Sequence, residues 1–158
     1  MDRSEAVTLL NDMCLLAPGT LLDPAIRWQP GDGPTARAQF TSGAHTISAV
    51  LEFGEDGLLS NFVSDDRSRS SPDGKSFTPL RFSTPVRNYR AFGPARLMGF
   101  GEARWLLPEG EFVYGEFELQ DVTMNRRPRS WRYPAKAGCD TVRAMKHSIS
   151  PGHHRQWR

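Results

Sequence analysis

The chain has 158 residues, of which 38% are hydrophobic and 24% charged, a composition typical of a single globular domain with a modest core. It contains no run of about 18 apolar residues, so we expect no membrane span. The first residues lack the basic start and apolar block of a secretion signal, and two cysteines make neither a disulfide framework nor a metal quartet. These features favour a cytoplasmic protein.

Charge divides the chain into two parts. Residues 1–125 carry 11 Lys/Arg and 17 Asp/Glu, a net charge of −6, whereas residues 126–158 carry 9 Lys/Arg and one acid, a net charge of +8. We therefore predict a folded domain over residues 1–125, followed by a basic, poorly ordered tail over residues 126–158.

The N-terminus has the pattern of a capped helix. Asp2 followed by Glu5 forms a capping-box pattern, and the predicted helix runs to about Ala17, before Pro18-Gly19. Apolar residues recur at offsets of three and four, which predicts one buried stripe; they are Ala6, Val7, Leu10, Met13, Cys14 and Ala17. Cys14 is accordingly expected to be a small buried residue.

Beyond the helix, alternating apolar and polar residues predict antiparallel strands. The predicted strands are Thr35–Thr41, His45–Phe53, Leu58–Ser64, Phe77–Phe82, Val86–Phe92, roughly Arg96–Met98, Gly101–Leu107 and Phe112–Met124. Gly54-Glu55-Asp56-Gly57 predicts a hairpin turn, and Pro85 predicts a sheet edge or a bend. In the last strand the buried residues change from odd positions, Phe117 and Leu119, to even positions, Val122 and Met124. We therefore expect a bulge near Gln120 or Asp121.

Together these elements predict an α+β, mainly β, fold. We expect a curved antiparallel sheet or half-barrel of about 7–9 strands, one N-terminal packing helix and an irregular basic C-terminal tail. The half-barrel folds of periplasmic lipoprotein carriers offer a fold analogy for this arrangement.

One stretch carries a recognisable pattern: Ser83-Thr84-Pro85 with Tyr89, then Gly101-Glu102-Ala103 with Trp105, Pro108-Glu109-Gly110, Phe112, Tyr114-Gly115 and Phe117. It resembles an uncharacterised bacterial family, a domain of unknown function. The resemblance covers residues 1–125, which correspond to the C-terminal half of the family's longer pattern. It implies no activity, because none is established for that family.

Amphipathic aromatic residues are the main candidates for ligand binding. Trp28, Tyr89, Trp105 and Tyr114 lie in or near predicted strands, and a concave sheet lined with such residues suits an apolar ligand with a polar end. Packing in the core is the alternative. Arg67 and Glu102 complete the six candidate ligand-binding residues as charged contacts.

Motifs for catalysis are missing from the sequence. Glycines 99 and 101 lack the third glycine of a nucleotide fingerprint, and no catalytic triad is recognisable. We therefore assign no catalytic residue and expect no cofactor, and we favour a non-enzymatic protein. The enzyme alternative is a hydrolase or isomerase using Asp66, Arg67 or Glu102 in a cleft at one end of the sheet.

The tail leaves further alternatives open. Cys139, His147, His153 and His154 do not have the spacing of a closed zinc site, so no metal site is assigned. Arginines interleaved with aromatic residues favour contact with anionic partners, including nucleic acid; they are Arg126, Arg127, Arg129, Trp131, Arg132 and Tyr133.

Three functions follow from the sequence. The first is a binding domain for an apolar or lipid-like ligand in the concave sheet, the second is the enzyme described above, and the third is an interaction module with a basic tail. An exposed sheet edge would in addition favour a homodimer.

Overall fold

The computed structural model describes residues 2–122 and the strand at residues 145–148. One helix, α1 (Arg3–Leu16), and a short 3-10 helix, η1 (Pro18–Leu22), precede the strands. The strands are β1 (Ile26–Pro30), β2 (Thr35–Ser42), β3 (His45–Phe53), β4 (Leu59–Ser64), β5 (Ser68–Ser70), β6 (Phe77–Pro79), β7 (Phe82–Arg87), β8 (Arg90–Phe92), β9 (Ala95–Leu97), β10 (Phe100–Leu107), β11 (Gly110–Leu119) and β12 (Met145–Ser148).

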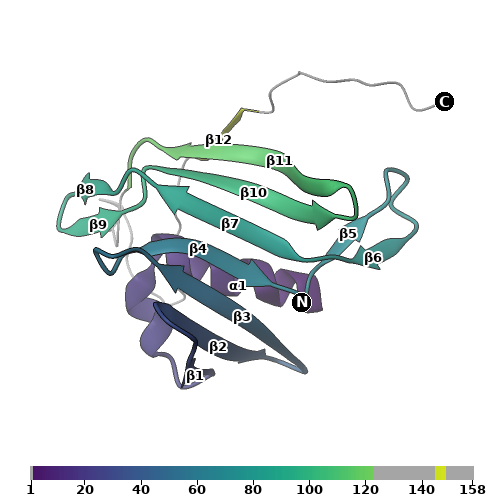
Figure 1. The fold of residues 1–158 in the computed structure, drawn as a ribbon, viewed down its shortest axis with the longest axis horizontal. Coiled ribbons are helices and arrows are strands. Elements are labelled where there is room, and N and C mark those ends of the chain that lie inside the picture. Colours follow the sequence, from purple (N-terminus) through teal and green to yellow (C-terminus); the bar gives the residue numbers. More distant parts are fainter. Residues whose placement is uncertain (1, 123–144, 149–158) are drawn as a thin grey trace, which may run out of the picture.

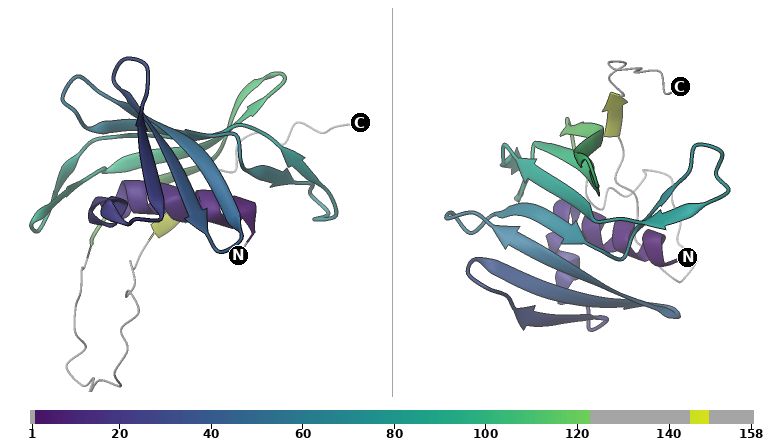
Figure 2. Two further views of the ribbon diagram at one scale, coloured as in Figure 1. Left: turned by 90° about the horizontal axis from the view of Figure 1, so that it is seen from below. Right: turned by 45° about the vertical axis from the view of Figure 1, so that its right-hand side comes forward.

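Eight of these strands form one antiparallel sheet, in the order β1-β2-β3-β4-β7-β10-β11-β12 (Figure 1). The remaining strands form two small hairpins, β5-β6 and β8-β9. The sheet is curved, and α1 lies on its concave side (Figure 2). We call the side that packs on α1 the inner face and the opposite side the outer face. The predicted class, a curved antiparallel sheet with an N-terminal helix, is confirmed.

The helix forms and ends as its sequence predicts. The Asp2 carboxylate accepts from the Glu5 N–H at 2.8 Å, and the Glu5 carboxylate accepts from the Asp2 N–H at 2.8 Å, so the capping box is complete. The buried stripe of α1 packs mainly on β2, β3 and β4, and Cys14 is buried within it with a free thiol.

Period-two burial fixes the two faces of the sheet. In β3, Ile47, Ala49 and Leu51 are buried against α1, whereas Ser48 and Glu52 face outward. The predicted hairpin after β3 is also present: the Gly54 N–H donates to the Leu58 carbonyl oxygen at 2.8 Å, and Gly57 has a φ of 73°. Paired strands therefore keep their apolar residues on the inner face.

The prediction that Pro85 marks a sheet edge is wrong, and its alternative, a bend, stays a prediction. Pro85 lies in β7, an interior strand between β4 and β10, where it pairs with Asn61. Proline has no N–H to donate to a ladder. The ladder between β7 and β10 accordingly skips the positions beside Pro85, since its pairs on either side are Gly101 with Val86 and Arg104 with Ser83.

Two predicted strands are divided in the structure. In the segment 77–82, residues 77–79 form β6 of the small β5-β6 hairpin, whereas Phe82 begins β7 of the large sheet. The segment 86–92 breaks at Asn88, whose φ of 58° lies in the left-handed region and interrupts an extended chain.

The predicted bulge is also misplaced. β11 ends at Leu119, before Gln120 and Asp121. The irregularity occurs earlier, where Ala103 pairs with Gly115 and Arg104 pairs with Val113, so that Tyr114 is the additional residue.

Part of the basic segment forms a strand. β12 pairs antiparallel with β11, with Met145 opposite Leu119 and Ser148 opposite Glu116. The other residues of the predicted tail lie outside the described residues, and its poor order stays a prediction.

Candidate functional site

The β5-β6 hairpin leaves the sheet at one end (Figure 1). Arg67, the residue before β5, contacts three aromatic rings there. The Arg67 guanidinium lies 4.2 Å from the centre of the Phe82 ring and 5.3 Å from that of Trp105. Its Nη1 donates a hydrogen bond of 3.0 Å to the Tyr114 hydroxyl. We call these four residues, Arg67, Phe82, Trp105 and Tyr114, the arginine–aromatic cluster.

Strand register brings the three rings together. Phe82 and Trp105 pair across β7 and β10 on the inner face, with ring centres 5.5 Å apart. The bulge in β11 then inserts Tyr114 beside Trp105, where the two rings stack at 5.6 Å with an interplanar angle of 22°.

The chain segment that carries Arg67 is held at four consecutive residues. Asp65 forms a two-point ion pair with Arg81, Asp66 accepts from the Ser48 N–H at 2.7 Å, and the Ser68 N–H donates to the Ser4 hydroxyl at 3.1 Å. Together with the bond from Arg67 to Tyr114, these contacts tie the segment to the sheet and to the start of α1. The chain on both sides of Arg67 is therefore anchored, and this anchoring fixes the position of the guanidinium.

A second arginine extends the cluster. Arg69 follows Arg67 by two residues, and its guanidinium lies 5.5 Å from the centre of the ring of Phe112, which precedes Tyr114 by two residues in β11. Phe112 and Tyr114 remain 43% and 39% exposed. Guanidinium groups over aromatic faces are attracted by the ring quadrupole, so this end of the molecule presents two cations on an aromatic platform.

Arg67 also influences the ionisation of a carboxylate on α1, Asp12. Burial raises the pKa of Asp12 above its ordinary value, and the positive charge of Arg67 partly offsets that rise. Burial likewise raises the pKa of Tyr114, again opposed by Arg67. Arg67 thus acts on groups from both the helix and β11.

The other three predicted binding residues lie elsewhere. The Trp28 Nε1 donates to the Leu21 carbonyl oxygen at 3.2 Å, and the side chain is 42% exposed on the edge strand β1. The Tyr89 hydroxyl donates to the Leu59 carbonyl oxygen at 3.0 Å. Of the six predicted residues the structure therefore brings together Arg67, Trp105 and Tyr114, and separates Trp28, Tyr89 and Glu102 from them.

Glu102 belongs to an ion network on the outer face. Its Oε1 accepts from Arg87 Nη1 at 2.8 Å and its Oε2 from Arg104 Nε at 2.9 Å, while Arg104 Nη1 also donates to Glu111 at 2.7 Å. The hydrogen bonds from Arg104, followed by those from Arg87, hold the pKa of Glu102 below its ordinary value although the residue is buried. The network binds three strands together.

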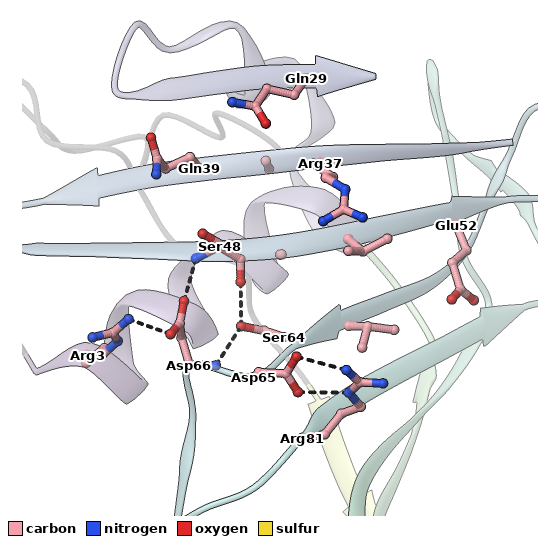
Figure 3. Close-up of a pocket in the computed structure, with 14 residues that line it drawn as sticks. Arg3, Gln29, Arg37, Gln39, Ser48, Glu52, Ser64, Asp65, Asp66 and Arg81 are labelled. Atoms are coloured by element: carbon pink, nitrogen blue, oxygen red, sulfur yellow. Dashed lines mark hydrogen bonds and ion pairs between the residues drawn. The ribbon is translucent and has the colours of Figure 1, made fainter. Parts of the chain in front are cut away.

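The outer face also carries a polar pocket of about 600 Å³ over β1 to β4 (Figure 3). Its labelled side chains are Arg3, Gln29, Arg37, Gln39, Ser48, Glu52, Ser64, Asp65, Asp66 and Arg81. Most of its charges are already paired, since Arg81 binds Asp65 and Arg3 binds Asp66. We interpret these pairs as fastening β4, β7 and α1 to one another.

The residues of the enzyme alternative have separate partners. Asp66 lines the polar pocket, Arg67 lies in the arginine–aromatic cluster, and Glu102 lies in the outer-face network. No hydrogen bond or ion pair joins any two of these three residues in the described part of the chain.

Sequence reasoning does not find Phe82, Arg69, Phe112 or Asp12. The spacing of Arg67 and Arg69 by two residues is a weak indication that both side chains lie on one side of a strand. The proximity of Phe82 depends on the pairing of β7 with β10, which the local pattern cannot reveal.

Two broader findings concern residues 2–122. Helix α1, the longer of the two helices there, is too short and insufficiently apolar to cross a membrane. Nor does that part of the chain gather three His, Cys, Asp or Glu side chains that could hold a metal ion. The tail residues considered for metal or nucleic acid have no described side chains.

These features define a class: an α+β domain in which one helix fills the concave side of a curved antiparallel sheet, with a cationic aromatic platform at one end. The chain belongs to the family of unknown function DUF6544, whose model matches residues 1–117. The predicted membership of a family without known function is thereby confirmed. A search of curated proteins and a search of solved structures each found no match.

Proposed function

We propose that this domain binds a small, apolar or lipid-like molecule on the inner face of its sheet, at the arginine–aromatic cluster. The observation that carries the proposal is the stacking of Arg67 on Phe82 and Trp105, with its hydrogen bond to Tyr114. Ligand sites in proteins are typically lined by aromatic side chains with a few convergent polar groups, and this cluster has both.

Partial exposure supports a binding role in addition to packing. Phe82 and Trp105 are buried, at 2% and 7% exposure, whereas Phe112 and Tyr114 at the same end keep about two fifths of their surface accessible. The buried rings therefore act as a fixed support, and the exposed rings offer the surface that a ligand would cover.

The first experiment is native mass spectrometry of the protein purified from cells without detergent. A retained adduct of lipid-like mass is the expected result, and it should be lost in Phe112→Ser. Leu106→Ser is the matched control, because Leu106 is 44% exposed but lies on the outer face of β10, beside the inward Trp105. A clean unliganded mass, or equal retention in both variants, would contradict the proposal.

Several expectations from the sequence stay predictions beside this one. They are the bacterial origin, the cytoplasmic location, the homodimer and the contact of residues 126–158 with anionic partners. The enzyme alternative gains no support, because Asp66, Arg67 and Glu102 are engaged with different partners.

A further inference from the structure

Arg67 and Arg69 differ from the arginines that fasten the fold. Arg3, Arg81, Arg87 and Arg104 each form an ion pair with a carboxylate. Within residues 2–122, neither Arg67 nor Arg69 has a carboxylate in ion-pair contact, and both instead lie against rings. Their charges are therefore available to an anion.

The buried Phe82 ring also makes Arg67 a better anion ligand. Phe82, only 2% exposed, lies under the Arg67 guanidinium and excludes water from that side. A charge pair in a partly water-excluded site is stronger than the same pair in bulk water. The stacked guanidinium keeps N–H groups at its edge, and that edge is the part that binds a carboxylate.

Two guanidinium groups are available to one head group, because Arg67 lies over Phe82 and Arg69 lies over Phe112 at the same end of the sheet. A carboxylate head group carries one negative charge on two oxygens, and each oxygen can accept a hydrogen bond from a guanidinium.

We propose that the ligand is a single-chain amphiphile with one negative charge, a long-chain carboxylate, whose head group binds Arg67 and Arg69. The Tyr114 hydroxyl, already bonded to Arg67, supplies a further polar group beside the head. The apolar chain covers the exposed parts of Phe112 and Tyr114. This inference rests on the proposed function and specifies the chemistry of its ligand.

The test compares three ten-carbon amphiphiles of different charge by isothermal titration calorimetry below their micelle concentrations. They are decanoate, decanol and decyltrimethylammonium. We expect decanoate to bind at least about tenfold more tightly than decanol, which corresponds to one charge-assisted contact. The cationic amphiphile should bind most weakly.

Variants identify the residues. Arg67→Gln and Arg69→Gln should each weaken decanoate binding by about tenfold and leave decanol binding nearly unchanged, because only the anion uses the charge. Arg27→Gln is the charge-matched control, since Arg27 lies exposed on β1 at the far side of the sheet. Thermal melting of each variant verifies that it is folded.

The outcomes separate this inference from the proposed function. Equal binding of decanoate and decanol would overturn the anionic head group and leave an apolar ligand standing. Absence of binding by all three amphiphiles would overturn both. An equal loss of decanoate binding in Arg27→Gln and Arg69→Gln would show a nonspecific charge effect and overturn the assigned site.

Discussion

Gly99 and Asn88 approach so closely that residue 99 has no room for a side chain. A Cβ at position 99 would lie closer than 3.0 Å to the Asn88 carbonyl oxygen, a separation that real Cβ atoms essentially never show. Asn88 itself has a φ of 58°, and the Gly99 N–H donates to the Arg87 carbonyl oxygen at 3.1 Å. Two backbone segments are thus packed directly on one another where β7 ends and β10 begins.

Gly99→Ala should lower the free energy of unfolding by about 1–3 kcal/mol, because the added methyl group meets backbone that cannot rotate away. Urea denaturation measures this change. Gly19→Ala is the matched control: a Cβ there meets nothing within 4 Å, so we expect a change within about 0.5 kcal/mol. A Gly99→Ala variant as stable as Gly19→Ala would contradict the close approach.

Glu102→Gln should destabilise the domain at neutral pH by about 1–3 kcal/mol, because Arg87 and Arg104 lose their shared carboxylate in a buried position. The folded pKa of Glu102 lies below its unfolded value, so its ionised form stabilises the fold above a pH of about 4.3. That contribution is lost as the pH falls through the folded pKa. The difference between wild type and variant should therefore shrink on acidification.

Urea denaturation across a pH series checks this dependence. Glu109→Gln, in the exposed turn between β10 and β11, provides the control and should follow wild type at every pH. A gap between wild type and Glu102→Gln that stays constant down to pH 2 would show that shape rather than charge is responsible.

Tyr89 should ionise at a higher pH in the folded domain than in the unfolded chain, and this difference should lower the stability of the domain at high pH. Burial, the largest cause, raises the pKa of its phenol to about 12, whereas the tyrosine of an unfolded chain ionises near pH 10. The folded state then retains a proton that the unfolded state loses, so stability falls as the pH rises from about 10 to 12. Tyr89→Phe should lack this part of the fall. Absorbance at 295 nm follows the ionisation, and a Tyr89 that titrates near pH 10 would refute the expectation.

Local features of the fold could be predicted because their causes lie within a few residues. The capping box at Asp2 and Glu5 and the alternation in His45–Phe53 each gave an element whose bounds the structure reproduces closely. The errors arise where pairing is distant. β7 joins β4 to β10 and bypasses the β5-β6 hairpin, which no local pattern specifies, and this pairing places Pro85 in the middle of the sheet.

The same limit applies to the candidate site. Residue type names Arg67, in a predicted loop, and Trp105 and Tyr114, on predicted strands, as candidates. However, 47 positions separate Arg67 from Tyr114 in the chain, so the sequence does not show that they meet. Their contact depends on the bulge that adds Tyr114 to the inner face, and the sequence suggests a bulge in a different place. The charge interaction between Asp12 and Arg67 depends on how α1 packs on the sheet, and sequence periodicity does not specify that packing for a single side chain.

Asp12→Asn should both stabilise the domain and strengthen anion binding. Burial raises the folded pKa of Asp12 above its unfolded value, so at neutral pH the folded state holds a charge that it accommodates poorly. The wild type loses stability as the pH rises from the unfolded to the folded pKa of Asp12, and the variant does not. Its advantage should be present at pH 7 and absent below a pH of about 4, near the unfolded pKa of aspartate.

Binding supplies the second readout. Without the Asp12 carboxylate the electrostatic potential around Arg67 is more positive, so decanoate should bind several-fold more tightly to Asp12→Asn and decanol should bind equally to both proteins. Urea denaturation at pH 4 and pH 7 and calorimetric titration measure the two effects. A variant that is less stable at pH 7 would mean that attraction to Arg67 outweighs the cost of burying Asp12. The carboxylate would then serve to hold Arg67 in place rather than to weaken the binding of an anion.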